Sequence, residues 1–301
     1  METPFPTLAA LVREKTGLPW SRARKLCAEG RVSVDGERCL DPAARVRPDA
    51  AVAVDAHAPK IGRGALAKEA IVFHDRDLVV VDKPAGMLTV GYEGEKDTLA
   101  ELARLLLRRI DRGAHDSGLG VAHRLDKETS GLVAFTRTAQ AKRSLAAQFR
   151  AHDLERSYVA LAHGVVAAGR IETFLLEDRG DGLRGSWGHF RRERGEPPPG
   201  AKRALTLVTP LEPLSGATLV ECRLETGRQH QIRIHLAELG HPVVGEKVYI
   251  RDYAGERLEA PRTMLHARTL GFAHPRSGTA LAFEREPPGD FRSRLESLRR
   301  L

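Results

Sequence analysis

The stretch Val121-Ala-His123-Arg124-Leu-Asp126-Lys-Glu-Thr-Ser-Gly-Leu-Val-Ala-Phe135 joins a charged segment to an apolar one. Its Thr129-Ser130-Gly131 segment predicts a turn, and Leu132 to Phe135 predict a buried strand. An acid at the edge of a buried strand, with cations on its approach side, is a candidate reaction centre. The alternative is that Asp126 caps a turn or pairs with a surface arginine.

Composition limits the class of protein. A chain of 301 residues can hold one large domain and one small domain. The net charge of +8 favours a polyanionic partner, nucleic acid first, although a basic surface can also serve solubility alone. The three cysteines show no paired short spacing, which fits a reducing compartment. Without a signal peptide or an apolar run of about 18 residues, we expect a cytoplasmic protein that does not enter a membrane.

Residues 1–58 predict a small basic domain. A helix is expected over 8–15, and a second helix capped by Ser21, followed by strands at 31–34 and 51–54. Three cations, Arg22, Arg24 and Lys25, crowd the first turns of the second helix, which is the unfavourable end of its dipole. This arrangement suggests phosphate contact, and a domain that docks onto protein is the alternative. A Pro- and Gly-containing linker is expected over 59–70.

Residues 71–301 predict a second, larger domain in which strands and helices alternate. Residues 177–202 are polar and rich in Gly and Pro, and we expect a loop there, whose contact with RNA is left open. The strands are expected at 71–73, 78–81, 132–135, 156–161, 203–206 and 218–224, and the helices at 99–110, 138–152, from 228 to 240, and near 291–298.

Several of these segments together resemble a known family. The motif His123-Arg124-Leu125-Asp126, followed by Thr129-Ser130-Gly131-Leu132, is similar to the nucleophile motif of the RluA-type pseudouridine synthases. Further matches follow in the expected order over residues 71–292. They are Lys83-Pro84-x-Gly86, Arg156-x-Tyr158-x-Ala160, Thr226-Gly227-Arg228-x-His230-Gln231-Ile232-Arg233, Leu265-His266-Ala267 and Glu286-Pro-Pro-Gly-Asp-Phe291.

A second resemblance concerns the N-terminal domain. Gly30-Arg31-Val32-x-Val34-Asp35-Gly36, after two helices, resembles the αL RNA-binding module first described in a ribosomal protein. The two resemblances imply an α+β protein. The catalytic domain would be a mixed, mainly antiparallel sheet flanked by helices and loops, preceded by a small helix-helix-β RNA-binding domain.

The resemblance implies a catalytic set of Asp126, Tyr158 and Arg233. Asp126 must stay ionised as nucleophile or as a stabiliser of positive charge at the anomeric carbon. A guanidinium, which the resemblance places at Arg233, lowers such a pKa by about 1–3 units and orients the carboxylate. Tyr158 is expected to stack on the uracil and relay a proton. Without its companion motifs, Tyr158 would be interpreted as a core aromatic.

Further residues are expected to bind the substrate. Arg124 would fill the gap left by the flipped base or hold a phosphate, and Leu265 would pack beneath the base. Lys83 would reach a phosphate, although an ordinary turn lysine is the alternative. The full substrate-binding prediction is Arg124, His123, Leu265, Arg228 and Lys83, and that for the N-terminal module is Arg22, Arg24, Lys25 and Arg31.

The predicted function is a cofactor-free isomerase that forms pseudouridine in structured RNA, with ribosomal RNA favoured over transfer RNA. No phosphate-binding loop or dinucleotide fingerprint is present. His230 and His235 are five apart, an awkward spacing for a metal site on one helix face. The alternative is a non-catalytic RNA-binding or ribosome-assembly factor, which needs no Asp126, Tyr158 and Arg233 set. We expect a monomer without a protein partner.

Overall fold

The structure is a computed structural model of the chain that describes residues 5–39, 42–47, 49–56, 66–91, 97–111, 118–189 and 195–300. It divides into two compact units, Met1–Leu66 and Ala67–Leu301. Most of the linker predicted at 59–70 lies outside the described residues, as do Phe190, Arg191 and Arg192 of the predicted loop. No helix in the described part of the chain combines the length and apolar character needed to cross a membrane.

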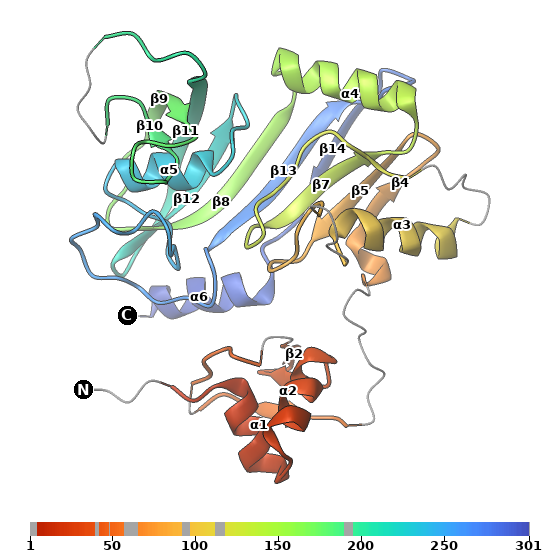
Figure 1. Ribbon diagram of the computed structural model, residues 1–301, viewed down its shortest axis with the longest axis vertical. Coiled ribbons are helices and arrows are strands. Elements are labelled where there is room, and N and C mark those ends of the chain that lie inside the picture. Colours follow the sequence, from red (N-terminus) through yellow and green to blue (C-terminus); the bar gives the residue numbers. More distant parts are fainter. Residues whose placement is uncertain are drawn as a thin grey trace. The chain divides into compact units, whose positions relative to one another are not determined.

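Unit 1 is the expected helix-helix-β arrangement (Figure 1). The Asp35-Gly36 pair has positive φ at both residues, 52° and 84°, and turns β1 back onto β2. Leu8, Val12, Leu26 and Val32 form its core. The elements are α1 (Leu8–Thr16), α2 (Trp20–Ala28) and a sheet in the order β2-β1-β3, with β1 at Val32–Val34, β2 at Glu37–Arg38 and β3 at Val52–Val54.

The start of α2 differs from the prediction. Pro19 occupies the N-cap position and the helix begins at Trp20, so the prediction of a Ser21 cap is wrong. The fixed φ of proline suits a helix start without a side-chain hydrogen bond. The expected cations remain exposed in the first turns of this helix, because Ala23, Leu26 and Cys27 form its buried side.

Within the described residues, unit 2 is built on an 11-stranded sheet that is almost wholly antiparallel, which confirms the predicted fold class. The main path runs β10-β9-β11-β12-β8-β13-β7-β5-β4, with β14 on β13 and β6 on β7. The strands are β4 (Ile71–His74), β5 (Leu78–Lys83), β6 (Gly120–Val121), β7 (Ser130–Thr136), β8 (Glu155–His163), β9 (Gly169–Leu176), β10 (Gly185–Ser186), β11 (Lys202–Leu214), β12 (Ala217–Leu224), β13 (Leu265–Ala273) and β14 (Ala280–Glu284).

The middle of the sheet is buried on both faces. Every residue of β7 is buried, and so is every residue of β8 after the first, as expected for their continuous apolar sequences. Among the described strand pairs, only β7 and β13 run parallel, with Ser130 opposite His266 and Gly131 opposite Ala267. Gly131 has a φ of 111°, and a Cβ atom there would clash with the Ala267 carbonyl oxygen. The close approach of these two strands therefore requires glycine.

Helices cover the sheet at several places (Figure 1). In α4, Ala141 and Leu145 pack on β7 and β13, and in α5, Ile234 packs on Ala204 of β11. His235 of α5 is fully buried and hydrogen-bonds Thr206 Oγ1 and Thr173 Oγ1, which fixes α5 on β9 and β11. The helices of this unit are η1 (Lys68–Ala70), α3 (Leu99–Ile110), α4 (Ala139–Ala151), α5 (Gln231–Glu238) and α6 (Gly289–Arg299).

We predict that Gly131→Ala lowers the free energy of unfolding by about 2–4 kcal/mol, because the methyl group must push β7 and β13 apart. Urea unfolding followed by circular dichroism measures the change. Gly278→Ala is the matched control. Gly278 also has positive φ, 73°, but no atom lies within 4 Å of the place that its added methyl group would take, so only backbone strain of about 1 kcal/mol applies. Equal losses in the two variants contradict the prediction.

Candidate active site

Asp126 lies in the turn between β6 and β7, and the rest of the protein holds this turn firmly. Thr89 Oγ1 donates to Leu125 O at 2.9 Å and accepts from Leu125 N at 3.1 Å. Arg262 Nη1 donates to Glu128 O at 3.1 Å. Asp126 itself is partly open to solvent, with 19% of its side chain exposed. The surroundings therefore fix the backbone of the turn while leaving the carboxylate accessible.

Lys83 belongs to this support, and the prediction that it reaches an RNA phosphate is wrong. Its side chain is fully buried, and its Nζ donates to the carbonyls of Pro84, Met87 and Lys127 at 3.0, 2.7 and 2.9 Å. Burial lowers the pKa of this ammonium to about 7. All three donors of the ammonium are used inside the protein, so Lys83 ties the end of β5 to the residue after Asp126.

Arg233 of α5 contacts Asp126 directly. Its Nη1 lies 3.3 Å from Asp126 Oδ2. Its Nε and Nη2 form a two-point contact with Glu246, both at 2.7 Å. Although burial opposes the charge, the hydrogen bonds and charges of Glu246 and Asp126 outweigh it and raise the pKa of Arg233. The guanidinium is therefore permanently charged and fixed in orientation beside Asp126.

Glu246 is the residue that holds Arg233. Its side chain is fully buried, and its Oε1 also accepts hydrogen bonds from Lys247 N and Val248 N at 3.0 and 2.9 Å. Burial would raise the pKa of this carboxyl, but Arg233 and the backbone N–H groups of Val248 and Tyr249 lower it. Glu246 is therefore ionised. It occupies Nε and Nη2 of Arg233, which leaves Nη1 for Asp126.

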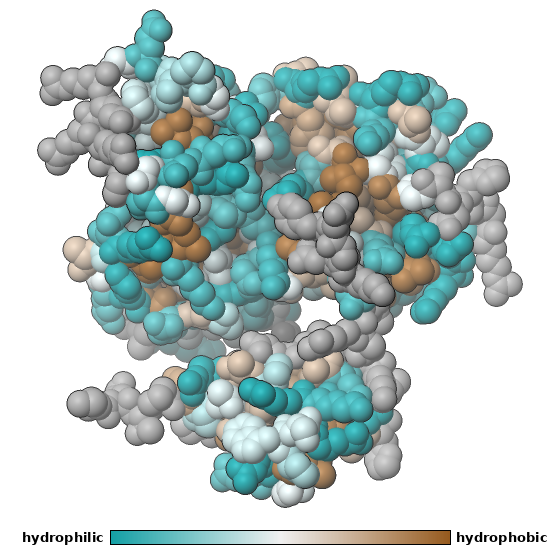
Figure 2. Space-filling view, in the orientation of Figure 1, coloured by the Kyte–Doolittle hydropathy of each residue, from teal (hydrophilic) through white to brown (hydrophobic). Residues whose placement is uncertain are grey.

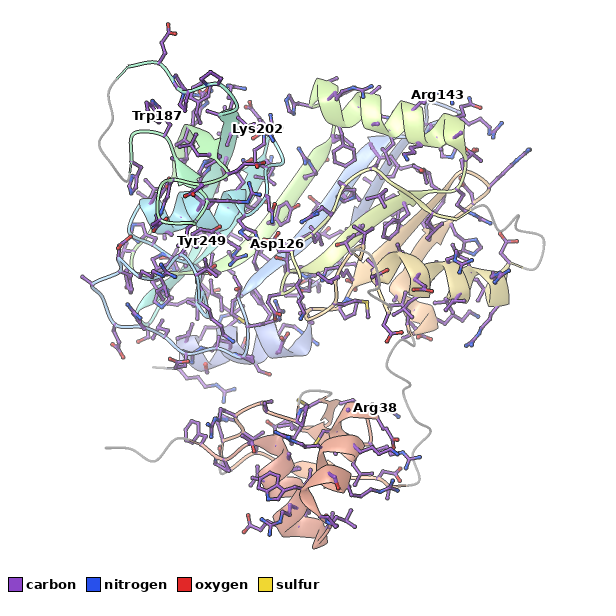
Figure 3. All side chains as sticks on the ribbon, viewed as in Figure 1. Arg38, Asp126, Arg143, Trp187, Lys202 and Tyr249 are labelled. Carbon is purple, nitrogen blue, oxygen red and sulfur yellow. The ribbon has the colours of Figure 1, made fainter. Side chains whose placement is uncertain are left out.

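His230 and Tyr249 extend the site on the α5 side, and Figure 3 labels Tyr249 there, with Asp126 over the middle of the sheet. His230 Nδ1 lies 2.7 Å from the Tyr249 hydroxyl, and His230 Nε2 lies 3.7 Å from Asp126 Oδ1. The Arg233 guanidinium lies over the Tyr249 ring at 5.2 Å. Burial lowers the pKa of His230 and raises that of Tyr249 to about 12, so both are neutral at pH 7.

Tyr158 projects from β8 on the face that α5 covers. It is opposite Cys222 of β12 and Ala267 of β13, and antiparallel partners point to the same side. Burial raises the pKa of its hydroxyl; nearby Arg156 opposes the rise and Asp126 adds to it. Leu265 is opposite Ala160, so it shares this face and is 4% exposed. The structure thus brings Asp126, Arg233, Tyr158 and Leu265 to one face.

The remaining predicted substrate contacts separate into two groups. Arg124 is exposed beside Asp126, and Arg228 is exposed in the turn before α5, with its Nε donating to Arg203 O at 3.0 Å. His123, in contrast, is occupied within the protein. Its Nε2 accepts from Ala134 N at 2.9 Å, its ring stacks on Phe149, and burial lowers its pKa to about 3. His123 is thus placed as support for β7, and its contact with the substrate stays a prediction.

The predicted cations of the N-terminal unit differ in exposure. Arg22, Arg24 and Lys25 are exposed on α2, whereas Arg31 is half-buried beside Glu29, with Nε 3.6 Å from Oε2. Lys25 also lies 3.9 Å from Glu29 Oε1. The three α2 cations are therefore the more accessible members of the predicted set.

Sequence reasoning missed several supports of the site. Glu246 follows Gly245, whose φ of 79° and contact with the Arg262 carbonyl require glycine. Because a buried Arg233 needs a counter-charge, an acid such as Glu246 could have been expected near it. The sequence around Thr89 and Arg262 gives no comparable indication of their roles. Among the described residues, no group of three or more His, Cys, Asp or Glu side chains could hold a metal ion.

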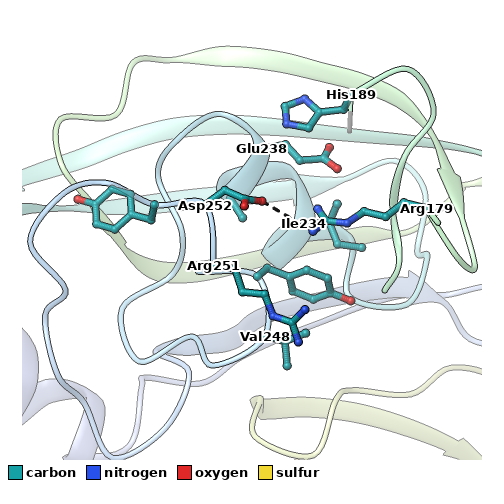
Figure 4. A pocket seen from close by; sticks show the side chains of 10 residues that line it. Arg179, His189, Ile234, Glu238, Val248, Arg251 and Asp252 are labelled. Carbon is teal, nitrogen blue, oxygen red and sulfur yellow. Dashed lines mark ion pairs between the residues drawn. The ribbon is translucent and has the colours of Figure 1, made fainter. Parts of the chain in front are cut away.

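A small pocket lies beside Tyr249, on α5 and the segment after Glu246 (Figure 4). Arg179, Glu238, Val248 and Asp252 are among its lining residues. Arg179 Nη2 lies 3.1 Å from Asp181 Oδ2 and 3.7 Å from Asp252 Oδ2. The charges that line this pocket are balanced, so it gives no sign of a bound ion.

Comparison with known proteins places these features in a family. A family model described as RNA pseudouridylate synthase matches residues 77–238, and an S4 domain model matches residues 9–52. "Ribosomal large subunit pseudouridine synthase D" of Zymomonas mobilis subsp. mobilis is 36% identical over 296 residues, covering 94% of this chain and 89% of the relative. The protein of the same name from Pseudomonas aeruginosa is 33% identical over 292 residues, covering 93% and 87%.

Solved structures agree on the fold. "Human RNA Pseudouridylate Synthase Domain Containing 4" superimposes with a TM-score of 0.61 at 23% identity. The match covers 77% of this chain and 93% of the human chain. At this level of identity the likeness shows the fold alone.

We predict that Glu246→Gln lowers the free energy of unfolding by roughly 3 kcal/mol, because it removes one charge from a buried ion pair and leaves Arg233 under-compensated. Urea denaturation at pH 7 measures the loss. Glu212→Gln is the control, since Glu212 contacts Arg299 in an exposed ion pair and its loss should change stability little. If the two substitutions cost the same, Glu246 does not hold Arg233 as described.

Proposed function

This chain belongs to the RNA pseudouridylate synthase family, whose members isomerise uridine to pseudouridine, and we propose that its substrate is large-subunit ribosomal RNA. Two relatives that align over most of their length carry that RNA in their names. The S4 match in unit 1 and the net charge of +8 support an RNA partner. Transfer RNA is the competing substrate.

The observation that carries the catalytic proposal is the Asp126–Arg233–Glu246 arrangement. An ionised carboxylate next to a uracil would be desolvated and would tend to bind a proton. The Nη1 of Arg233, 3.3 Å from Asp126, opposes that tendency. Glu246 secures the opposite edge of the guanidinium. A protein that only binds RNA needs no such charge pair beside a partly exposed carboxylate.

The reaction can be written with protein groups alone. The bond between N1 of uracil and C1′ of ribose breaks, the base rotates, and C5 forms a bond to C1′. A proton leaves C5 and a proton is gained at N1, so atoms and electrons balance without an external reagent. Asp126 would act as the nucleophile, or would stabilise the positive charge that develops at C1′. No step calls for a cofactor.

Tyr158 and Leu265 would receive the base. Both share the sheet face that α5 covers. The charge of Asp126 adds to the raised pKa of the Tyr158 hydroxyl. The Tyr158 ring offers a stacking surface for a uracil taken out of its helix, and Leu265 an apolar contact. Arg124, exposed beside Asp126, would fill the space that the base vacates or hold a neighbouring phosphate. Flipping costs a few kcal/mol, which phosphate contacts would offset.

We predict that Asp126→Asn abolishes pseudouridine formation, by more than about 10³-fold, while RNA binding persists. Large-subunit ribosomal RNA and transfer RNA transcribed in vitro serve as substrates, with pseudouridine mapped by chemical modification and filter binding giving Kd. Asp153→Asn, at an exposed loop position, is the control and should retain full activity. Activity retained in Asp126→Asn removes Asp126 from this role, and modification of transfer RNA alone overturns the substrate assignment.

The three exposed cations of α2 give a separate prediction. Replacing Arg22, Arg24 and Lys25 together by Gln in the full chain should weaken RNA affinity. It should also reduce the slope of log Kd against log salt concentration by up to about 2. The reason is that RNA binding releases fewer counterions when fewer phosphates are contacted. Filter binding at several salt concentrations measures both quantities. An unchanged slope means that this face of α2 does not contact RNA.

A further inference from the structure

Arg156 of β8 is a buried cation that has no acidic partner among the described residues. It is 7% exposed, and no carboxylate in the described part of the chain forms an ion pair with it. Its Nη2 donates two long hydrogen bonds, to Leu224 O at 3.5 Å and Glu225 O at 3.3 Å. Its Nε is enclosed and has no hydrogen-bond partner within the described ranges. Its guanidinium lies over the Phe149 ring at 5.3 Å.

The other buried arginines beside the site are balanced. Arg233 makes a two-point contact with Glu246, and Arg262 makes one with Asp290 at 2.6 and 3.0 Å. Arg156 has carbonyl oxygens at the limit of hydrogen-bond distance in place of such an acid. Leaving a buried charge unpaired is costly, and burial lowers the pKa of Arg156. A buried arginine without an acid of the protein beside it is suited to bind an anionic group of the substrate.

The position of Arg156 fits a substrate group. Residues two apart on a strand point to the same side, so Arg156 shares the sheet face of Tyr158. Burial raises the pKa of the Tyr158 hydroxyl, and the charges of Arg156 and Asp126 act on it in opposite directions. In Figure 2 the surface is hollowed between the part of the sheet near α5 and the part near α4, and β8 passes between these helices in Figure 1.

We propose that Arg156 binds a backbone phosphate of the RNA strand that carries the target uridine, beside Tyr158. This inference rests on the proposed function, because the ligand is the RNA substrate. At neutral pH the phosphates carry the formal negative charges of RNA, and a guanidinium fork matches their oxygens. Gly227 borders the site, since a Cβ atom there would lie 2.6 Å from Arg156 Nη1. A side chain at position 227 would obstruct that nitrogen.

A purely structural role for Arg156 is the competing explanation. In that case the guanidinium would serve to hold the carbonyls of Leu224 and Glu225, before the turn that leads to α5. The two bonds are long compared with the usual 2.9 Å or so, and they use only one of three nitrogens. The two explanations differ in salt dependence, because a structural contact releases no counterions from RNA.

The test compares Arg156→Met, Arg156→Lys and Gly227→Ala in the full chain, with in vitro transcribed large-subunit ribosomal RNA as the probe. Gly227→Ala is the mild variant: Gly227 does not have positive φ, and the nearest atoms to the added methyl belong to the end of a flexible side chain. Arg223→Gln is the matched control. Arg223 lies on the neighbouring strand on the opposite face of the sheet, where it pairs with Glu221.

We expect Arg156→Met to weaken Kd about 10-fold and to reduce the salt slope of binding by about 0.7–0.9. Gly227→Ala should reproduce part of both changes, and Arg156→Lys should keep the slope. Arg223→Gln should leave the slope of the wild type unchanged.

A salt slope unchanged in Arg156→Met and in Gly227→Ala overturns the phosphate assignment, whether or not these variants lose stability. A fall in kcat with unchanged Kd also overturns it, and would place Arg156 at the reacting uracil. If the wild-type protein binds the RNA but forms no pseudouridine, the proposed function fails, and the slopes still decide the role of Arg156.

Discussion

The site depends on one guanidinium shared between two carboxylates. Glu246 takes the Nε and Nη2 edge of Arg233, which leaves Nη1 for Asp126 at 3.3 Å. The division is unequal, because Glu246 is fully buried and supported by backbone donors, whereas Asp126 is partly exposed. One acid thus anchors the arginine and the other stays accessible. Buried charge is acceptable in this trio because each of its three members has a counter-charge.

The sheet brings these groups together from distant parts of the chain. Asp126 precedes β7, Tyr158 lies on β8, Arg233 on α5, and Glu246 follows the turn at Gly245. Their positions are rigid because the intervening backbone is tied at many points: Lys83 and Thr89 hold the Asp126 turn, and His235 fixes α5 on β9 and β11. Charge placement at the site therefore follows from packing on one face of the sheet.

The sequence alone predicted much of this arrangement. Apolar runs and caps located the central strands and the helices at 99–110 and 138–152, because burial and capping leave local patterns. Resemblance singled out Asp126, Tyr158 and Arg233. The resemblance did not predict the buried position of Lys83, whose ammonium binds carbonyls up to 44 positions away. It also did not indicate Glu246, whose role becomes visible only when Arg233 lies next to it in the structure. Polar residues on loops carry no periodicity that would reveal such contacts.

The parallel pairing of β7 with β13 also affects how the protein forms during synthesis. Ser130 and His266 are neighbours in the sheet but are separated by more than a hundred residues of chain. The ribosome releases the turn that carries Asp126 long before Arg233, Glu246 and strand β13. Unit 2 thus completes its folding late, because it depends on contacts between residues far apart in the sequence, which form slowly. The core of unit 1, in contrast, consists wholly of residues near the N-terminus. A nascent chain can therefore hold a folded N-terminal unit well before it can carry out chemistry.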